Sequence, residues 1–132
     1  MGSELDVDMA DVYVVDDEKL IASTLALILA QNGYRAISFT NPLEALKSAI
    51  TQPPAILISD VIMPEMNGFA LAIKFQARFP RCKVLLLSGQ AVTTDLLDNA
   101  RQRGYDFTVL AKPIHPRDLL AAIGHLATES QP

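Results

Sequence analysis

Short apolar runs alternate with segments of helical periodicity along most of this chain. Several runs are continuous, which is typical of parallel strands buried on both faces, whereas Tyr34 to Phe39 alternates as a short strand. The segments between the runs repeat apolar residues every three or four positions. The predicted strands occupy residues 12–15, 34–39, 56–58, 83–87 and 106–110. The apolar stripes of the predicted helices begin at Leu20, Leu43, Phe69, Leu96 and Leu119. The chain is therefore predicted to alternate strand and helix five times.

Capping residues support two of these helix starts. Asn41, Pro42 and Glu44 match an N-cap, a first helical residue and a capping acid for the second helix. Thr93 or Thr94 is predicted to cap the fourth helix. The hydroxyl and amide side chains therefore fall where helices are expected to begin.

Strands and helices that alternate over short connections indicate parallel pairing through right-handed crossovers. We predict a single α/β domain of the flavodoxin-like kind, a three-layer (βα)5 arrangement with helices on both faces of a parallel five-stranded sheet. The predicted strand order is 2-1-3-4-5, whose switch point lies between strands one and three. The domain is expected at residues 11–127, with a frayed N-terminus at 1–10 and a polar tail at 128–132.

Composition narrows the class of protein. The chain has 132 residues, half of them apolar, which suffices for one domain with a hydrophobic core. Its net charge of −4 argues against direct binding of nucleic acid through a basic face. Cys82 is the only cysteine, and no apolar stretch has the length of a membrane helix. We therefore expect a cytoplasmic protein without disulfides or direct membrane contact.

Charged residues stand where three of the predicted strands end. Asp16 and Asp17 follow the first strand, Asp60 follows the third, and Lys112 follows the fifth. Ligands of open parallel sheets bind at the carboxyl ends of the strands, so these side chains are candidates for one shared site. Either strand-one acid alone could instead be a helix N-cap, and Ser88 could be no more than a turn residue.

Acids held this close together favour a divalent cation. Carboxylates a few ångströms apart repel by about 4 kcal/mol per pair at an effective dielectric of 20, so they take up protons or recruit a cation. Oxygen ligands with waters and a phosphate oxygen suit octahedral Mg²⁺. Asp60 beside such an ion is arranged to form an aspartyl phosphate, with Lys112 and Ser88 as donors to the phosphate oxygens.

These residues occur in an order that resembles the receiver domain of two-component response regulators from Asp11 to about Ala127. The matching segments are Val15-Asp16-Asp17-Glu18, Asp60-Val61-Ile62-Met63-Pro64-Glu65-Met66-Asn67-Gly68, Leu87-Ser88-Gly89 and Lys112-Pro113. Each segment alone is a weak signal, but the order and spacing together are specific.

The resemblance implies a role for each site residue. Asp60 would accept phosphate from a histidine kinase or a histidine phosphotransfer protein. Asp17 would bind Mg²⁺ directly, Asp16 through water, and Ile62 through its backbone carbonyl. Ser88 and Lys112 would contact the phosphoryl group. The chain would catalyse only its own phosphorylation and dephosphorylation, so it is not expected to be an enzyme with a separate substrate.

The sequence also departs from the family pattern. The position three residues before Lys112, where similar domains carry an aromatic ring that turns inward on phosphorylation, is Val109. We therefore expect switching through the loop after Ser88 and the fourth helix. Ile62 and Gln90 stand where similar domains flank the path of the hydrolytic water, and an apolar Ile62 cannot orient it. Slow autodephosphorylation is the resulting prediction.

Other functions share parts of this pattern. A phosphohydrolase that works through an aspartyl phosphate would need an acid two residues after the nucleophile, where this chain has Ile62. A flavodoxin would need a glycine- and hydroxyl-rich loop after strand one, where the chain is acidic. A receiver fold that binds partners without phosphate stays open, as does a receiver segment of a larger hybrid kinase or transcription regulator. Similar domains commonly form homodimers through the fourth helix, fifth strand and fifth helix.

Overall fold

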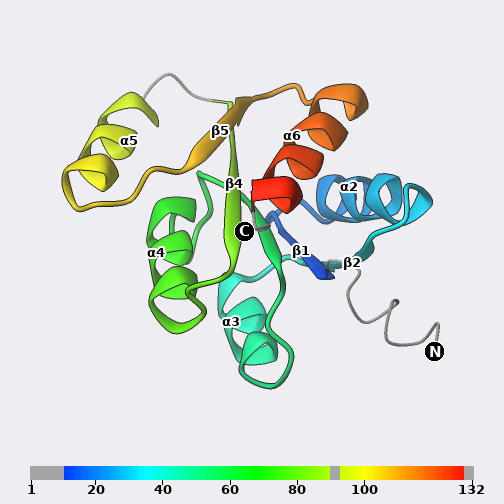
Figure 1. The fold of residues 1–132 in the computed structure, drawn as a ribbon, viewed down its shortest axis with the longest axis horizontal. Helices are drawn as coiled ribbons and strands as arrows, with labels where there is room; N and C mark the ends of the chain where they lie inside the picture. Colours follow the sequence, from blue (N-terminus) through cyan, green and yellow to red (C-terminus); the bar gives the residue numbers. More distant parts are fainter. Residues whose placement is uncertain (1–10, 90–92, 130–132) are drawn as a thin grey trace.

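Five parallel strands and five helices alternate along the chain in the computed structural model, which describes residues 11–89 and 93–129. The strands are β1 (Asp11–Val15), β2 (Arg35–Phe39), β3 (Ile56–Asp60), β4 (Lys83–Ser88) and β5 (Thr108–Ala111). The helices are α2 (Lys19–Gln31), α3 (Pro42–Thr51), α4 (Gly68–Arg78), α5 (Thr93–Gln102) and α6 (Pro116–Glu129). The sheet has the order β2-β1-β3-β4-β5 (Figure 1), which confirms the predicted flavodoxin-like fold.

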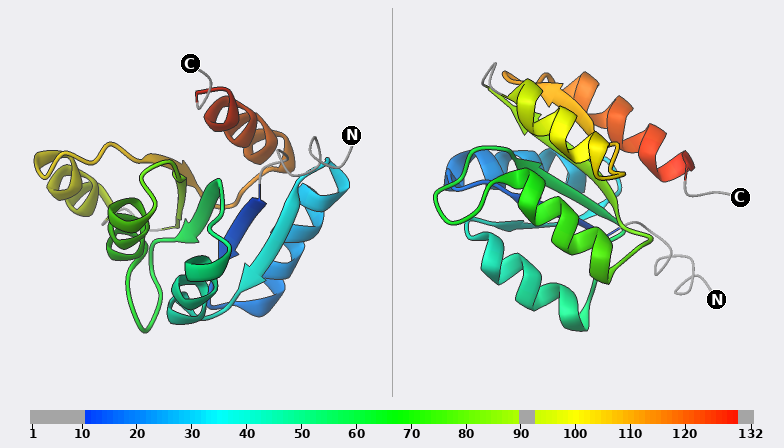
Figure 2. Two further views of the ribbon diagram at one scale, coloured as in Figure 1. Left: turned by 60° about the horizontal axis from the view of Figure 1, so that its bottom comes forward. Right: turned by 90° about the vertical axis from the view of Figure 1, so that its left-hand side faces the viewer.

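Helices cover both faces of the sheet. Helices α2 and α6 pack on one face, and α3, α4 and α5 pack on the other (Figure 2). Side chains of β1 alternate between the two cores, with Tyr13 and Val15 in one and Val12 and Val14 in the other. Because successive side chains of a strand point to opposite faces, this unbroken apolar run is buried on both sides.

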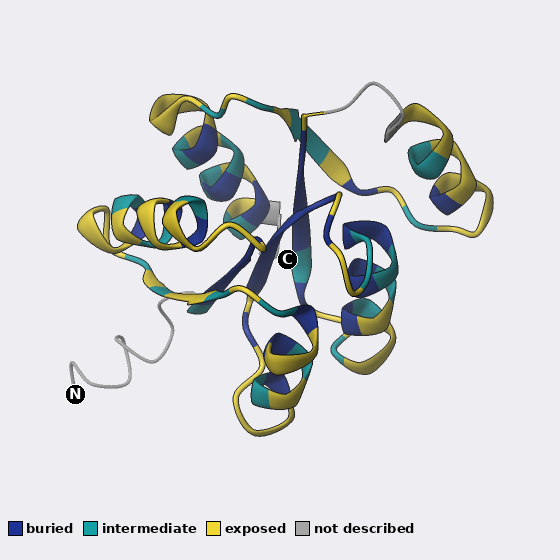
Figure 3. Cartoon of the chain, turned by 180° about the vertical axis from the view of Figure 1, so that it is seen from behind, coloured by how far each residue is buried: buried dark blue, intermediate teal, exposed yellow. Residues whose placement is uncertain are grey.

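Burial follows the layers. Strand β3 is buried throughout, β1 and β4 are buried after their first residue, and the helices expose their outward sides (Figure 3). Among the described residues, none of the helices combines the length and the apolar character needed to cross a membrane.

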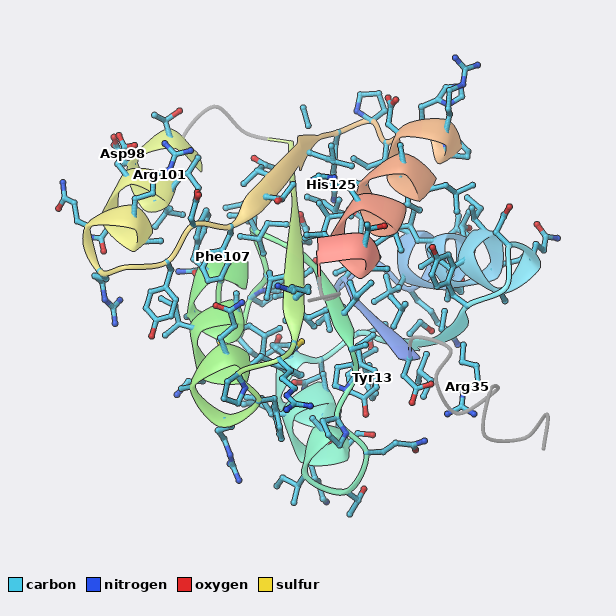
Figure 4. All side chains as sticks on the ribbon, in the orientation of Figure 1. Tyr13, Arg35, Asp98, Arg101, Phe107 and His125 are labelled. Carbon is cyan, nitrogen blue, oxygen red and sulfur yellow. The ribbon has the colours of Figure 1, made fainter. Side chains whose placement is uncertain are left out.

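The hydroxyl of Tyr13 fixes the C-terminal end of α3 against the sheet. Tyr13 is fully buried, and its hydroxyl donates to the carbonyl oxygen of Gln52 at 2.6 Å and lies 3.0 Å from the Ser48 hydroxyl. Figure 4 shows this ring on β1, beside α3. A buried phenol needs such partners, because an unpaired polar group in the core is costly.

Several element boundaries differ from those predicted. Strand β5 begins at Thr108 and not at Asp106, although Phe107 is buried against Phe69 of α4, with 6.1 Å between ring centroids. Figure 4 shows Phe107 beside α4. Helix α6 passes the predicted domain boundary at Ala127, and the Thr128 hydroxyl donates to the carbonyl of Gly124 within its last turn. The N-terminus predicted to be frayed, residues 1–10, lies outside the described residues.

The predicted cap of α3 is confirmed. The Asn41 side chain accepts a hydrogen bond from the amide of Leu43 at 2.8 Å, and Pro42 is the first helical residue. Helix α5 contains both Thr93 and Thr94, and the residue before it lies outside the described ranges.

Candidate functional site

The predicted site residues converge at the carboxyl edge of the sheet. Strand pairing aligns Val15 with Ser59, Asp60 with Leu87, and Ser88 with Ala111. Each of these residues lies at the end of its strand or one residue before it, so the residues that end or directly follow the strands share one edge. Those residues are Asp16, Asp17, Asp60, Ser88 and Lys112.

Three carboxylates form the acidic part of this site. One carboxylate oxygen each from Asp16, Asp17 and Asp60 lies within 4.8 Å of the other two. Asp16 is fully buried, Asp60 is 7% exposed, and Asp17 is exposed. Only Asp17 therefore faces water fully, which gives a cation from solvent an accessible first ligand.

Lys112 is the positive charge of the site. Its Nζ lies 3.1 Å from Oδ1 of Asp60 and 3.3 Å from Oδ2 of Asp16. The backbone amide of Lys112 donates to the carbonyl of Ser88 at 2.8 Å, which continues the β4–β5 ladder by one residue. The peptide bond between Lys112 and Pro113 is cis. One ammonium thus bridges acids from two different strands.

Asp16 has a structural position that the sequence did not reveal. Its amide donates to the carbonyl of Phe39 at 3.0 Å, so it extends the pairing of β1 with β2. Its Oδ1 accepts from the amide of Glu18 at 2.9 Å, while Oδ2 accepts from Lys112. Both oxygens are held by the protein, so Asp16 anchors the ammonium and shapes the turn into α2. The bond from the Glu18 amide to Asp16 is that of an Asx turn, and it is similar to the N-cap hydrogen bond considered for an acid at this position.

Burial and the neighbouring charges shift two pKa values. Burial raises the pKa of Asp60 above its ordinary value, the hydrogen bond from Lys112 opposes that shift, and the nearby Asp16 adds to it. Burial alone would lower the pKa of Lys112, but its contacts with Asp60 and Asp16 outweigh burial and raise it. Lys112 therefore keeps its proton at neutral pH, whereas a second cation near Asp60 would favour the ionised carboxylate.

Gly68 lets the loop after β3 return to the site. Its amide donates to the carbonyl of Val61 at 2.7 Å. A Cβ at this position would collide with the backbone carbonyl of Asp60, so the close approach requires glycine. Asn67, the residue before Gly68, is the N-cap of α4, and its side chain accepts a hydrogen bond from the amide of Ala70 at 2.8 Å. In the sequence Gly68 stands out only as the last residue of the segment that begins at Asp60, and the spacing gives no sign of this contact.

We expect Gly68→Ala to destabilise the domain by roughly 1 to 3 kcal/mol, because the added methyl group meets backbone and not a movable side chain. Urea denaturation would measure the loss. Gly124→Ala is the matched control, since a Cβ at Gly124 meets no atom within 4 Å. Equal stability of the two variants would contradict the close approach of α4 to Asp60.

The remaining predicted residues surround the cluster. Ser88 is buried at the end of β4, and Ile62 is 49% exposed two residues after Asp60. Val109 is half-buried in β5 and packs against the core under α4 and α5, so no aromatic ring occupies that position. Gln90, the other residue predicted to influence hydrolysis, lies outside the described residues.

The fold and the site together define a class of protein, a flavodoxin-like domain with an acidic, lysine-bridged cluster at its switch point. The response regulator receiver domain family matches residues 12–124. The chain therefore belongs to the family of response regulator receiver domains, which confirms the resemblance found in its sequence.

Individual relatives are similar at moderate identity. The chain is 34% identical to the transcriptional regulatory protein CreB of Escherichia coli over 85% of its own length and 48% of CreB. It is 30% identical to the response regulator receiver protein CpdR of Brucella abortus over 87% of its length and 94% of CpdR. It thus spans about half of CreB and about a quarter, 26%, of the transcriptional regulator NtrC.

Solved structures share the fold. A CheY-like receiver domain protein from Methanospirillum hungatei matches with a TM-score of 0.85 at 25% identity, covering 94% of this chain and 98% of that one. The chemotaxis protein CheY4 of Vibrio cholerae matches with a TM-score of 0.78 at 28% identity, covering 89% of this chain and 98% of CheY4.

Proposed function

We propose that this chain is a phospho-accepting response regulator in which Asp60 takes a phosphoryl group from a histidine kinase or a histidine phosphotransfer protein. The observation that carries the proposal is the bridge from Lys112 to Asp60 at 3.1 Å inside a cluster of three carboxylates. An ion pair that served only stability would not require two further acids at the same point. Membership of the receiver family supports the same role.

Mg²⁺ is the proposed cofactor, and the donor set fits it. Three carboxylates and one ammonium leave excess negative charge, and all the donors are oxygens, which Mg²⁺ prefers. Asp17 and Asp60 would bind the ion directly, Asp16 through water, and Ile62 through its carbonyl. The fixed hydrogen bonds of both Asp16 oxygens agree with an indirect role. When bound, the ion would offset the negative charge that phosphorylation brings to the site.

The proposed reaction transfers a phosphoryl group between two side chains. A carboxylate oxygen of Asp60 attacks the phosphorus of a phosphohistidine, a phosphorus–oxygen bond forms, and the phosphorus–nitrogen bond breaks to release the histidine. Lys112 and Ser88 would hold phosphoryl oxygens while charge builds on them. Hydrolysis of the same acyl phosphate returns Asp60 and inorganic phosphate, so no separate substrate is turned over.

The proposed output is a change in affinity for a protein partner. Val109 has no ring to turn inward, so we place the switch in Ser88 and helix α5. Homodimerisation through α5, β5 and α6 would be one form of this output. Since CreB and NtrC are transcriptional regulators that extend beyond the matched region, a receiver segment of a larger regulator is a second candidate. A phosphate-independent interaction module is a third, favoured by Val109.

Intact mass after incubation with acetyl phosphate and Mg²⁺ tests the proposal. We expect the wild type to gain about 80 Da, the mass of one phosphoryl group, and Asp60→Asn to gain none. Asp98→Asn, which changes an exposed acid of α5, should be phosphorylated like the wild type. A folded wild type that gains no mass would refute the phospho-acceptor function and leave the phosphate-independent module.

The phosphorylated protein should lose its phosphate slowly. Ile62 presents an apolar, half-exposed side chain two residues after Asp60, and it cannot orient a water for attack. We expect a half-life of minutes or longer, and Ile62→Asn should shorten it by about tenfold by supplying a polar group. Release of phosphate followed by intact mass over time would measure this, and a wild-type half-life of seconds would contradict it.

A further inference from the structure

A groove runs between α3 and α4, two helices that lie side by side on one face of the sheet (Figure 2). Its volume is about 370 Å³, and its lining residues are Leu46, Lys47, Ile50, Lys74, Ala77 and Arg78. Leu46 lies at the middle of α3, and the other lining residues lie in the C-terminal halves of the two helices, which lead to the starts of β3 and β4. The groove is therefore separate from the acidic site, which lies at the strands' opposite ends.

One wall of the groove is apolar and faces solvent. Of the lining residues, Ile50 is 58% exposed and Leu46 is half-buried. Leu43, which lies outside the groove and one turn before Leu46, is 53% exposed. The three residues are spaced at i, i+3 and i+7, so they form one stripe over about 10 Å of α3. The hydroxyl of Tyr13 holds this helix end on the sheet, so the stripe is presented on a fixed element.

Cations flank this stripe. Lys47, Lys74 and Arg78 are exposed, and among the described residues none of the three has a carboxylate within 4.0 Å. None of the described residues that line the groove is acidic, although the whole chain carries a net charge of −4. The helix dipole favours Arg78, which lies in the last turn of α4, but it does not explain Lys47, which lies before the last turn of α3.

We infer that this groove binds an acidic amphipathic helix of a partner protein. Apolar side chains of that helix, one and two turns apart, would pack on Leu46 and Ile50, and its acids would meet the three cations. Charge complementarity of this kind selects partners and speeds association. The contact uses no residue of the acidic site, so it does not require phosphorylation of Asp60.

A model helix provides the probe. A fluorescein-labelled peptide of about 18 residues, with leucines at i, i+4 and i+7 and glutamates on the other face, spans roughly 27 Å as a helix. We expect it to raise fluorescence anisotropy on binding the full chain without Mg²⁺ or acetyl phosphate. Lys47→Glu with Lys74→Glu should weaken binding at least tenfold. The matched control, Arg103→Glu with Arg117→Glu, makes the same charge change outside the groove and should leave binding unchanged.

A second pair of variants tests the apolar wall. Ile50→Glu should weaken binding at least tenfold, whereas Leu27→Glu, at a residue of α2 with 57% exposure, should not. All six side chains that these variants and controls replace are exposed, and thermal melts followed by circular dichroism would show that each variant is folded. Amide chemical shifts on adding the peptide should change along α3 and α4.

Three results would overturn the inference. The first is equal affinity of the wild type and both groove variants for the peptide. The second is equal binding of a peptide with lysines in place of glutamates. The third is self-association of the chain in sedimentation that Lys47→Glu with Lys74→Glu abolishes, which would assign the groove to a second copy.

Discussion

Lys112→Met should slow phosphorylation of Asp60 by acetyl phosphate by about 10²- to 10³-fold, the typical cost of removing one donor to a developing anionic oxygen. The ammonium of Lys112 already lies 3.1 Å from the Asp60 carboxylate, so it stands where a phosphoryl oxygen on Asp60 would carry charge. Methionine keeps an unbranched side chain of similar length and removes only the charge and its hydrogen bonds. Intact mass against time would give the rate.

The same substitution should also destabilise the domain, with a defined dependence on pH. Asp16 and Asp60 are buried and would lose their shared cation, at a cost of roughly 2 to 4 kcal/mol at neutral pH. Burial already raises the pKa of Asp60, and loss of Lys112 removes the contact that opposes this rise. The folded variant would then hold a proton on Asp60 at pH values where the unfolded chain has released it, from about pH 4 upward.

The free energy of unfolding of Lys112→Met should therefore fall as pH rises from that point. The difference in the free energy of unfolding between the wild type and Lys112→Met should be smaller at about pH 4.5 than at about pH 7.5. Urea denaturation at both pH values would measure it. Lys19→Met, at an exposed lysine of α2, serves as the control and should change neither stability nor phosphorylation rate. A phosphorylation rate within a factor of two of the wild type would rule out Lys112 as a phosphate ligand.

Mg²⁺ should stabilise the wild type against heat, and Asp17→Asn should remove most of that effect. The ammonium of Lys112 contacts Asp16 and Asp60, and Asp17 is a third carboxylate of the same cluster, so a divalent ion would relieve the remaining repulsion. An ion present at ten times its dissociation constant adds about 1.4 kcal/mol, which raises the melting temperature of a domain of this size by roughly 3 to 6 °C. Differential scanning calorimetry with and without about 10 mM Mg²⁺ would measure the shift in melting temperature. This concentration is ten times a dissociation constant of about 1 mM.

Asp17 is the informative residue for this test because it is the exposed member of the cluster. Asp16→Asn would also break the contacts with Lys112 and Glu18, so its effect on the metal could not be separated from its effect on folding. The control Asp98→Asn removes an exposed acid of α5 that is not part of the cluster, so this variant should keep the full effect of Mg²⁺ on the melting temperature. An equal shift in Asp17→Asn and the wild type would exclude Asp17 as a ligand.

Periodicity and strand order could be predicted from the sequence because burial on both faces leaves an unbroken apolar run. The convergence of Asp17, Asp60 and Lys112 followed from that order alone, since parallel strands end at a common edge. Boundaries were less accurate where a side chain is buried outside regular structure. Phe107 looks like a strand residue, but it fills the core from the segment before β5.

Other features depend on contacts between residues distant in sequence. The collision that makes Gly68 necessary involves the backbone of Asp60, and it depends on how the intervening loop folds back. The hydrogen bond from Lys112 to Asp16 joins residues that are 96 positions apart in the sequence. The partners of the Tyr13 hydroxyl likewise come from the end of α3. Spacing along the chain contains no signal for any of these contacts.

Strand β5 lies at the edge of the sheet, where β4 is its one partner among the described strands, yet it leads directly to Lys112. Edge segments with partly exposed backbone open locally at lower free energy than central strands do. A fluctuation that detaches β5 would withdraw the ammonium while Asp16 and Asp60 stay in place on β1 and β3. In amide hydrogen exchange, protection of the β4–β5 ladder would then report how long the site remains assembled, separately from the lifetime of the whole fold.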